Sequence, residues 1–499
     1  MAPPQYLTIR NLSPHTLTIL TLERYAIGTQ LPTLKDVTNV KNITRSFSNL
    51  FKKTSLKDAP LPSSLPFSNA GNAKIAPGIQ ALHTEQVQVQ IAPFSTLNGD
   101  QSQIKLLKDG PNEILRITFT TNVAGKWSVD VNPYSEVVSR QLIHYASPGM
   151  STEEDYTAAL WHIAQSHLSL VWTPPLNKWQ SGLPANLPLS AFSTPGTHNS
   201  PTHYIAAPSV RCQTHPLTIQ LANGIRFLDI RAQPEQKGDN AWLVHGKFPI
   251  SLTGKYLLTS LLDDVYKFLA ANPSEIVMIS LKREGPFDVP DETFSKILHE
   301  KIIAPHATNW YTSPEIPTVQ QARGKCVLIR RFNLHPELQN WGIDAHSWRY
   351  NTPNDTSPSG LIQVQDFSEV LAAENVGQKI EYVQAHIARA AALNFTKTPV
   401  HGASVATTPI YLNFLSGSNF WNIKAWPEGV SDKVTPAVTE YLAIKHSSTS
   451  QDGDDGTGVL VADYVGDQDW GLMKLIVAMN GVVVGRLQKQ QQLAQEQKK

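Results

Sequence analysis

The sequence is poor in cysteine, in charge and in long apolar segments. Its 499 residues contain two cysteines, Cys212 and Cys326, which excludes a disulfide-stapled scaffold and a zinc module built on several cysteines. Charged residues make up 17% of the chain, and 42 basic against 41 acidic residues leave a net charge of +1. This balance excludes a generally basic nucleic-acid-binding protein, so we expect no nucleic-acid partner.

No run of about 18 consecutive apolar residues is present, so the sequence predicts no membrane-spanning helix. The first ten residues, MAPPQYLTIR, lack the charged and apolar regions of a signal peptide. We therefore expect a cytoplasmic protein or one bound to a membrane surface, with secretion that needs no recognisable signal as the alternative. The hydrophobic content of 41% supports a sizeable core, and the length predicts two or three domains.

The first part of the chain is patterned as β-strands. Apolar and polar side chains alternate, with many β-branched residues, in residues 6–10, 17–22, 86–91 and 114–120. We predict an all-β, sandwich-like domain over residues 1–145 and a linker over 146–184. Residues 35–75 are polar and basic, with Phe47 and Phe51 close to Lys52 and Lys53, and form either a membrane-surface contact or an ordinary solvated loop.

From residue 185 the pattern changes to short apolar runs with helical stretches between several of them. Eight runs predict buried strands: 187–198, 224–231, 241–245, 275–282, 326–332, 361–366, 410–416 and 459–464. This order predicts an α/β fold, an irregular (β/α)8 barrel of the TIM type, over residues 185–486. It is irregular because residues 232–240 are too few for a crossover helix. Residues 487–499 are a polar tail.

Nearly every run ends at or near a polar residue suited to catalysis. In chain order these residues are His198, Asp229 with Arg231, His245, Lys282, Arg331, Asp366, Ser416 and Asp463. Because the carboxyl ends of barrel strands converge on one mouth, we predict a single pocket that holds them. Histidines act as general base and general acid near neutral pH, and arginine and lysine stabilise charge on phosphoryl oxygens. The set suits cleavage of a phosphodiester without a metal.

Six motifs carry a more specific resemblance. They are FSTPGTHNS (192–200), GIRFLDIR (224–231), LVHG (243–246), VMISLKR (277–283), RGKCVLIRRF (323–332) and IQVQD (362–366). Their order and spacing resemble the X domain of bacterial-type phosphatidylinositol-specific phospholipase C, in the superfamily of PLC-like phosphodiesterases. The resemblance implies cleavage of the glycerol–phosphate bond of phosphatidylinositol, or of GPI-type lipids, through a cyclic inositol phosphate. The implied partners are a phosphoinositide or related phospholipid and a membrane surface, to which the protein binds peripherally.

The resemblance also implies roles for individual residues. His198 would be the general base that removes the inositol 2-hydroxyl proton, and His245 the general acid that protonates the leaving diacylglycerol oxygen. Arg231 would stabilise the charged phosphorane, and Asp229 would orient Arg231 or His245. Asp463 would orient His198, although a carboxylate that merely caps a strand end is the alternative.

The headgroup would be bound by Lys282, Arg331 and Asp366, which the resemblance implies contact inositol hydroxyls or phosphate. Asn199 is a further substrate-binding candidate, at a position where bacterial relatives commonly carry an aspartate that assists the acid histidine. The residues after Asp366 lack the aromatic platform that the family uses for inositol. A different phospholipid substrate therefore stays open, as does a catalytically inactive barrel that only binds lipid.

We expect no cofactor and no metal ion. Animal-type relatives hold calcium with carboxylates at the positions that match Asp229, Arg231 and Lys282. Two of these positions carry cations here, which would repel a divalent ion. The sequence therefore predicts a calcium-independent enzyme.

Overall fold

The computed structural model describes residues 6–26, 80–105, 113–122, 125–131, 139–141, 143–145, 155–162, 166–207, 209–235, 238–371, 375–395, 408–446 and 453–496. They form two compact units, the first made chiefly of residues before Leu168 and the second chiefly of residues from Ser169 onward. The basic segment 35–75, suggested by the sequence as a membrane contact or a solvated loop, lies outside the described residues.

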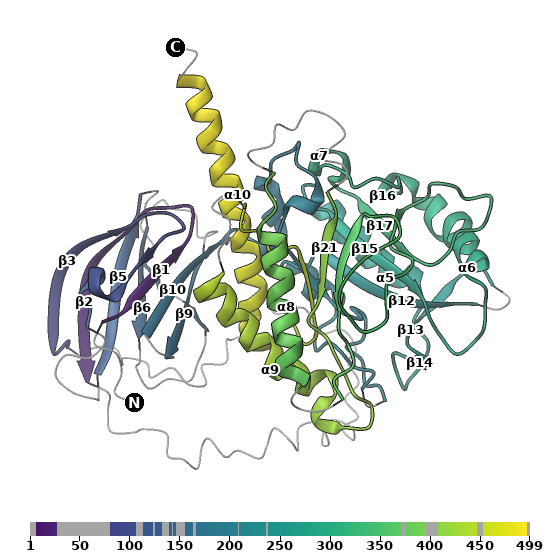
Figure 1. The fold of residues 1–499 in the computed structure, drawn as a ribbon, viewed down its shortest axis with the longest axis horizontal. Coiled ribbons are helices and arrows are strands. Elements are labelled where there is room, and N and C mark those ends of the chain that lie inside the picture. Colours follow the sequence, from purple (N-terminus) through teal and green to yellow (C-terminus); the bar gives the residue numbers. More distant parts are fainter. Residues whose placement is uncertain are drawn as a thin grey trace. The chain divides into compact units, whose positions relative to one another are not determined.

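Two five-stranded sheets are formed by the N-terminal part of the described chain (Figure 1). One has the order β3-β2-β5-β6-β8 with antiparallel pairs throughout, and the other has the order β4-β1-β10-β9-β7. The strands are β1 (Thr8–Leu12), β2 (Leu17–Ala26), β3 (His83–Ile91), β4 (Thr96–Leu97), β5 (Glu113–Thr121), β6 (Lys126–Val131), β7 (Ser139–Gln141), β8 (Ile143–Tyr145), β9 (Asp155–His162) and β10 (Ser166–Thr173). The range 146–184, expected to be a linker, thus contains β9 and β10. The sandwich-like domain and the domain boundaries stay predictions.

The second unit contains a curled, mostly parallel sheet. Its central order is β16-β17-β15-β12-β11-β22-β21-β20-β19, and every pair along it is parallel except β20 with β19. The strands are β11 (Thr194–Thr197), β12 (Phe227–Pro234), β15 (Val277–Arg283), β16 (Trp310–Tyr311), β17 (Cys326–Arg331), β19 (Thr352–Thr356), β20 (Ile362–Asp366), β21 (Ile410–Phe414) and β22 (Val459–Ala462). The mixed α/β fold is confirmed, while closure into a complete (β/α)8 barrel stays a prediction.

One of the eight predicted strands has a different role. The run 241–245 forms β13 (Ala241–His245), which pairs antiparallel with β12 and with the short β14 (Phe248–Pro249). It is therefore not one of the parallel strands, because the short connection from β12 allows only a hairpin-like return. A further short strand, β18 (Ile343–Asp344), extends the sheet beside β17.

The parallel strands form because their residues are apolar on both faces. In β15, Val277 to Leu281 are all buried, and only the last two residues, Lys282 and Arg283, are partly exposed. Parallel strands covered by helices on one side and packed inward on the other have this continuous apolar pattern. The polar residues at the carboxyl end mark where the strand leaves the core.

Helices accompany the sheet: α4 (Leu217–Ala222), α5 (Leu258–Ala271), α6 (Asp291–Ile297), α7 (Val319–Ala322), α8 (Asn375–Ala391), α9 (Pro427–Glu440) and α10 (Gly471–Glu496). In α5 the buried positions recur at helical spacing, from Leu258 through Leu262 and Val265 to Leu269. Helices α8, α9 and α10 lie side by side (Figure 1).

The C-terminal helix is apolar in its first half. Gly471–Leu493 is, among the described residues, the one helical segment long and apolar enough to cross a membrane, and half of the window that qualifies is buried in the protein. Asn480 in this helix holds Ser193 just before β11, accepting from its backbone N–H at 2.9 Å and donating to its carbonyl at 2.9 Å. The helix therefore serves as a core element beside the strand that leads to His198. The last turns of α10 include residues 487–496, which belong to the segment predicted as a polar tail.

Candidate active site

The pairing of β11 with β22 brings the first histidine against a carboxylate. Thr197 lies opposite Ala462 in the parallel register, so the next residues, His198 and Asp463, emerge together at the carboxyl end of the sheet. His198 Nδ1 lies 2.7 Å from Asp463 Oδ1, and both side chains are largely buried. The Gln213 side chain braces this junction by donating to the backbone carbonyls of His198 and Ala462.

The partners of His198 define its tautomer. The Arg231 guanidinium contacts His198 Nε2 at 2.9 Å, and a guanidinium can only donate. Nε2 must therefore be the acceptor, which leaves the proton on Nδ1, where it is donated to Asp463. His198 is thus held with its basic nitrogen toward Arg231, the arrangement that a general base needs.

Three cations stand at one level on neighbouring strands. Arg231 on β12 is in register with Lys282 on β15, which is in register with Arg331 on β17. Asp229, two residues before Arg231, accepts from Arg231 at 3.2 Å and from Arg331 at 3.3 Å. Burial alone raises the pKa of Asp229, but the two guanidiniums outweigh it and lower that pKa to about 2. Asp229 therefore stays ionised and fixes both arginines.

Glu284 is a member of this cluster that the sequence analysis missed. Its carboxylate accepts from Lys282 at 2.6 Å, from Arg231 at 3.2 Å and from the backbone N–H of Gly246 at 2.9 Å. Burial raises its pKa, but the charges of Arg231 and Lys282 dominate and lower it overall. The available signal was its position two residues after Lys282, where side chains in a strand return to the same side.

The second histidine comes from the antiparallel strand β13. His245 Nδ1 lies 2.8 Å from the Val210 carbonyl oxygen and 3.8 Å from Cys212 Sγ, so its Nε2 is the nitrogen left for substrate. Its ring stands edge-on to that of His198, with the centroids 5.7 Å apart. Burial, Arg231 and His198 lower the pKa of His245 to about 3, so this histidine is neutral near pH 7.

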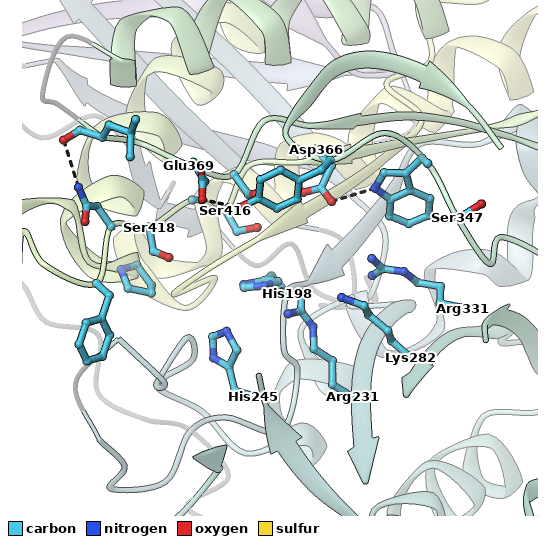
Figure 2. A pocket seen from close by; sticks show the side chains of 18 of the residues that line it. His198, Arg231, His245, Lys282, Arg331, Ser347, Asp366, Glu369, Ser416 and Ser418 are labelled. Atoms are coloured by element: carbon cyan, nitrogen blue, oxygen red, sulfur yellow. Dashed lines mark hydrogen bonds between the residues drawn. The ribbon is translucent and has the colours of Figure 1, made fainter. Parts of the chain in front are cut away.

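These groups line one cavity of about 770 Å³ (Figure 2). Of the predicted site residues, the cavity wall includes His198, Arg231, His245, Lys282, Arg331, Asp366 and Ser416. Figure 2 shows the three cations and His245 on one side, Asp366, Glu369 and Ser416 on the other, and His198 between them. Strand ends far apart in sequence thus converge on one pocket in the described part of the chain.

Three predicted site residues are buried next to the cavity and do not line it. Asp229 and Asp463 are buried and act on the lining residues through Arg231 and His198. Asn199 is fully buried, in the left-handed conformation that asparagine tolerates, and its backbone N–H donates to Asp229 at 3.2 Å. Asn199 therefore does not line the cavity, and the substrate-binding role expected from the sequence stays a prediction.

Aromatic residues are present in the cavity, in contrast to the expectation from the residues after Asp366. Trp348 donates its indole N–H to Asp366 at 3.0 Å, and the Arg331 guanidinium lies 4.2 Å from the centre of its ring. Tyr350 also lines the cavity and donates to Glu369. These side chains come from the segment between β18 and β19, so reading along the chain from Asp366 could not find them.

The side chains give a divalent cation little to bind. Arg231 and Lys282 form ion pairs with Glu284. Among the described residues, His198, Cys212 and Asp463 are a group whose ligating atoms come within 4.8 Å of one another. Burial raises the pKa of the Cys212 thiol well above its usual value, which disfavours the thiolate that a metal would need.

Comparison with known proteins finds one family for this part of the chain. Residues 185–332 match the model of "Phosphatidylinositol-specific phospholipase C, X domain". A 1-phosphatidylinositol phosphodiesterase of Listeria monocytogenes is 32% identical over 174 residues, which are 32% of this chain and 51% of that protein. The enzyme of the same name from Staphylococcus aureus is 26% identical over 319 residues, covering 61% of this chain and 93% of that protein.

Solved structures of the same enzymes are also similar. A phosphatidylinositol-specific phospholipase C from Staphylococcus aureus gives a TM-score of 0.48 at 22% identity, covering 61% of this chain and 98% of that chain. The enzyme from Listeria monocytogenes gives 0.43 at 21% identity, covering 60% and 98%. The resemblance predicted from the motifs is confirmed by the family match, which spans residues 185–332.

Proposed function

We propose that this protein is a metal-independent phosphodiesterase that cleaves the glycerol–phosphate bond of phosphatidylinositol or of GPI-type lipids. The observation that carries the proposal is the pair of histidine rings, whose centroids are 5.7 Å apart, with Arg231 2.9 Å from the unprotonated Nε2 of His198. His198 presents an unprotonated Nε2 that contacts a guanidinium, and His245 presents Nε2 to the cavity. The matched relatives bear the name 1-phosphatidylinositol phosphodiesterase.

The first step is an internal attack. His198 Nε2 accepts the proton of the inositol 2-hydroxyl, and the resulting oxygen nucleophile forms a bond to phosphorus. The imidazolium that develops is stabilised by the Asp463 carboxylate, 2.7 Å from Nδ1. Arg231, released from Nε2 by the incoming hydroxyl, donates to the phosphoryl oxygens as their negative charge grows.

The second part of the step breaks the bond from phosphorus to the glycerol oxygen. A proton on His245 Nε2 passes to that oxygen, so diacylglycerol leaves and inositol 1,2-cyclic phosphate remains. The phosphate charge of bound substrate offsets the repulsion by Arg231, which is, after burial, a cause of the low pKa of His245. Substrate binding therefore favours the protonated form that the acid role needs.

Headgroup binding uses the rest of the cavity. Lys282 and Arg331 provide positive charge beside Arg231, and Asp366 accepts from ring hydroxyls. Trp348, already bonded to Asp366 and stacked on Arg331, presents an apolar surface for the carbon face of the ring.

The rim of the cavity suits a peripheral contact to a membrane. Leu371, Phe420 and Trp421 line the cavity, and Ile423 lies two residues after Trp421. Trp421 is 89% exposed, Ile423 71% and Leu371 66%. Exposed tryptophan and aliphatic side chains of this kind enter the interfacial region of a bilayer.

The test is turnover of defined lipids. Vesicles of phosphatidylinositol, phosphatidylcholine or sphingomyelin are incubated with the protein in EDTA, and released phosphate esters are measured. We expect products from phosphatidylinositol alone, with loss of about 10²–10⁴-fold in rate for His198→Ala or His245→Ala. Cleavage of another lipid instead contradicts the headgroup assignment, and no cleavage of any of them contradicts the enzymatic proposal.

A further inference from the structure

A second histidine–carboxylate pair faces the cavity and has no part in the cleavage step. His346 lines the cavity, and its Nδ1 lies 2.9 Å from Asp344 Oδ1, the oxygen that also accepts from the His346 backbone N–H at 3.0 Å. The other oxygen of Asp344 is held by Arg330 at 2.8 Å. Both oxygens of the carboxylate are therefore engaged.

This pair is built into the sheet. Asp344 is the last residue of β18. This strand pairs parallel with β17, and Arg330 lies opposite Asp344 in the register. Burial raises the pKa of Asp344, but the bonds from His346 and the charge of Arg330 outweigh it and lower that pKa overall. An ionised Asp344 keeps the proton on His346 Nδ1, so that Nε2 is left as an acceptor for a group in the cavity.

The place of His346 in the cavity is at the headgroup end. Ser347, the next residue, also lines the cavity. Trp348, one residue further, stacks on Arg331 and bonds to Asp366. A ligand that reaches His346 while its phosphate lies at Arg231 must extend across the headgroup pocket.

The charges of the cavity indicate what kind of group His346 meets. Arg231, Lys282 and Arg331 are already opposed by Asp229 and Glu284, which accept from all three. Asp366 and Glu369 add two more carboxylates to the lining. With one substrate phosphate bound, a second anionic substituent is poorly balanced, whereas an uncharged hydroxyl is well matched to the Nε2 acceptor.

We propose that His346 determines headgroup specificity by accepting a hydrogen bond at Nε2 from a ring hydroxyl of the inositol, with Asp344 as its positioning residue. This inference rests on the proposed function and goes beyond it, since it assigns hydroxyl recognition to a residue outside the six motifs. One hydrogen bond of this kind corresponds to an effect of about 3- to 10-fold on binding.

The experiment compares His346→Ala with a matched control. His335→Ala removes another histidine paired with a carboxylate, Glu337 at 3.6 Å, in a different surface depression. Binding of myo-inositol 1-phosphate and of inorganic phosphate is measured by calorimetry, and turnover of phosphatidylinositol is measured separately. Because inorganic phosphate has no ring, it engages the cations and leaves His346 uninvolved.

We expect His346→Ala to weaken binding of inositol 1-phosphate about 3- to 10-fold, to leave that of phosphate unchanged and to raise KM with kcat within about 2-fold. Asp344→Asn is expected to show the same pattern at smaller size, and His335→Ala no change. Equal weakening of both ligands, or unchanged binding of inositol 1-phosphate, overturns the inference. A wild-type protein that binds inositol 1-phosphate but cleaves no lipid overturns the proposed function instead, while the comparison of variants still decides the role of His346.

Discussion

Replacing Asp463 by asparagine tests the catalytic arrangement at its most sharply defined contact. The change removes one negative charge 2.7 Å from His198 Nδ1 and keeps the size of the side chain. The asparagine carbonyl can still accept from Nδ1, and Arg231 still requires an acceptor at Nε2, so the tautomer of His198 is retained. The loss is therefore the charge of the partner alone.

The expected loss of activity in Asp463→Asn can be estimated from the lost charge, because the tautomer of His198 is retained. A hydrogen bond to a charged group is worth about 1.5–3 kcal/mol. If that stabilisation develops with the imidazolium in the transition state, kcat/KM falls about 10- to 150-fold, at about 1.4 kcal/mol per factor of ten. A loss of about 10⁴-fold, as occurs where such a substitution imposes the wrong tautomer, is not expected because Arg231 prevents it.

The assay is release of inositol phosphates from phosphatidylinositol vesicles, with stability measured by denaturant unfolding. Asp454→Asn is the matched control, because Asp454 is also buried and close to β22 but lies before that strand, where it accepts from the Phe395 N–H and from Arg486. We expect this control to lose stability and keep kcat/KM within about 2-fold. If Asp463→Asn keeps wild-type kcat/KM, or if both variants lose activity equally, the orienting role of Asp463 is refuted.

Three further outcomes are expected. Activity in excess EDTA equals that without chelator, since Arg231 and Lys282 line the cavity and their positive charge would repel a divalent cation; loss of activity that calcium restores contradicts this. Trp421→Ala, at a side chain 89% exposed, reduces vesicle binding about 10-fold in sedimentation assays, because burying such a side chain is worth about 1.5–3 kcal/mol; unchanged binding excludes Trp421 from the membrane contact. The pKa of His245 is lowered from 6.5 to about 3, so the unfolded chain binds more protons than the folded chain between these pH values. The free energy of unfolding therefore decreases as the pH is lowered. From about pH 7 to about pH 5 this histidine alone costs roughly 2 kcal/mol, as an order of magnitude, and His245→Gln is expected to lessen the acid dependence of the unfolding free energy accordingly; an unaltered dependence refutes the assignment.

The polar residues at strand ends could be predicted to meet because parallel strands place their carboxyl ends at one edge. That rule depends only on local pattern, and it brought His198, Arg231, Lys282, Arg331 and Asp366 to one cavity. The eight apolar runs were likewise detectable, since strands buried on both faces are continuously apolar.

Pairing partners and loop paths could not be predicted in the same way. His245 reaches the cavity from an antiparallel strand, and its bond to the Val210 carbonyl joins two segments that no local pattern connects. Trp348 and His346 come from a segment without strand pattern and depend on the pairing of β18 with β17. The burial of Asn199 follows from a left-handed turn after His198, which residue type alone permits but does not require.

The central claim is that two histidines cleave phosphatidylinositol through internal attack of the 2-hydroxyl. Phosphorus NMR of phosphatidylinositol vesicles, followed in time with wild-type protein and with His198→Ala in EDTA, tests it most directly. We expect the wild type to produce the signal of a five-membered cyclic phosphodiester before any phosphomonoester appears, and His198→Ala to abolish this signal. Direct appearance of a phosphomonoester without the cyclic species, or formation of the cyclic species at the wild-type rate by His198→Ala, would contradict it.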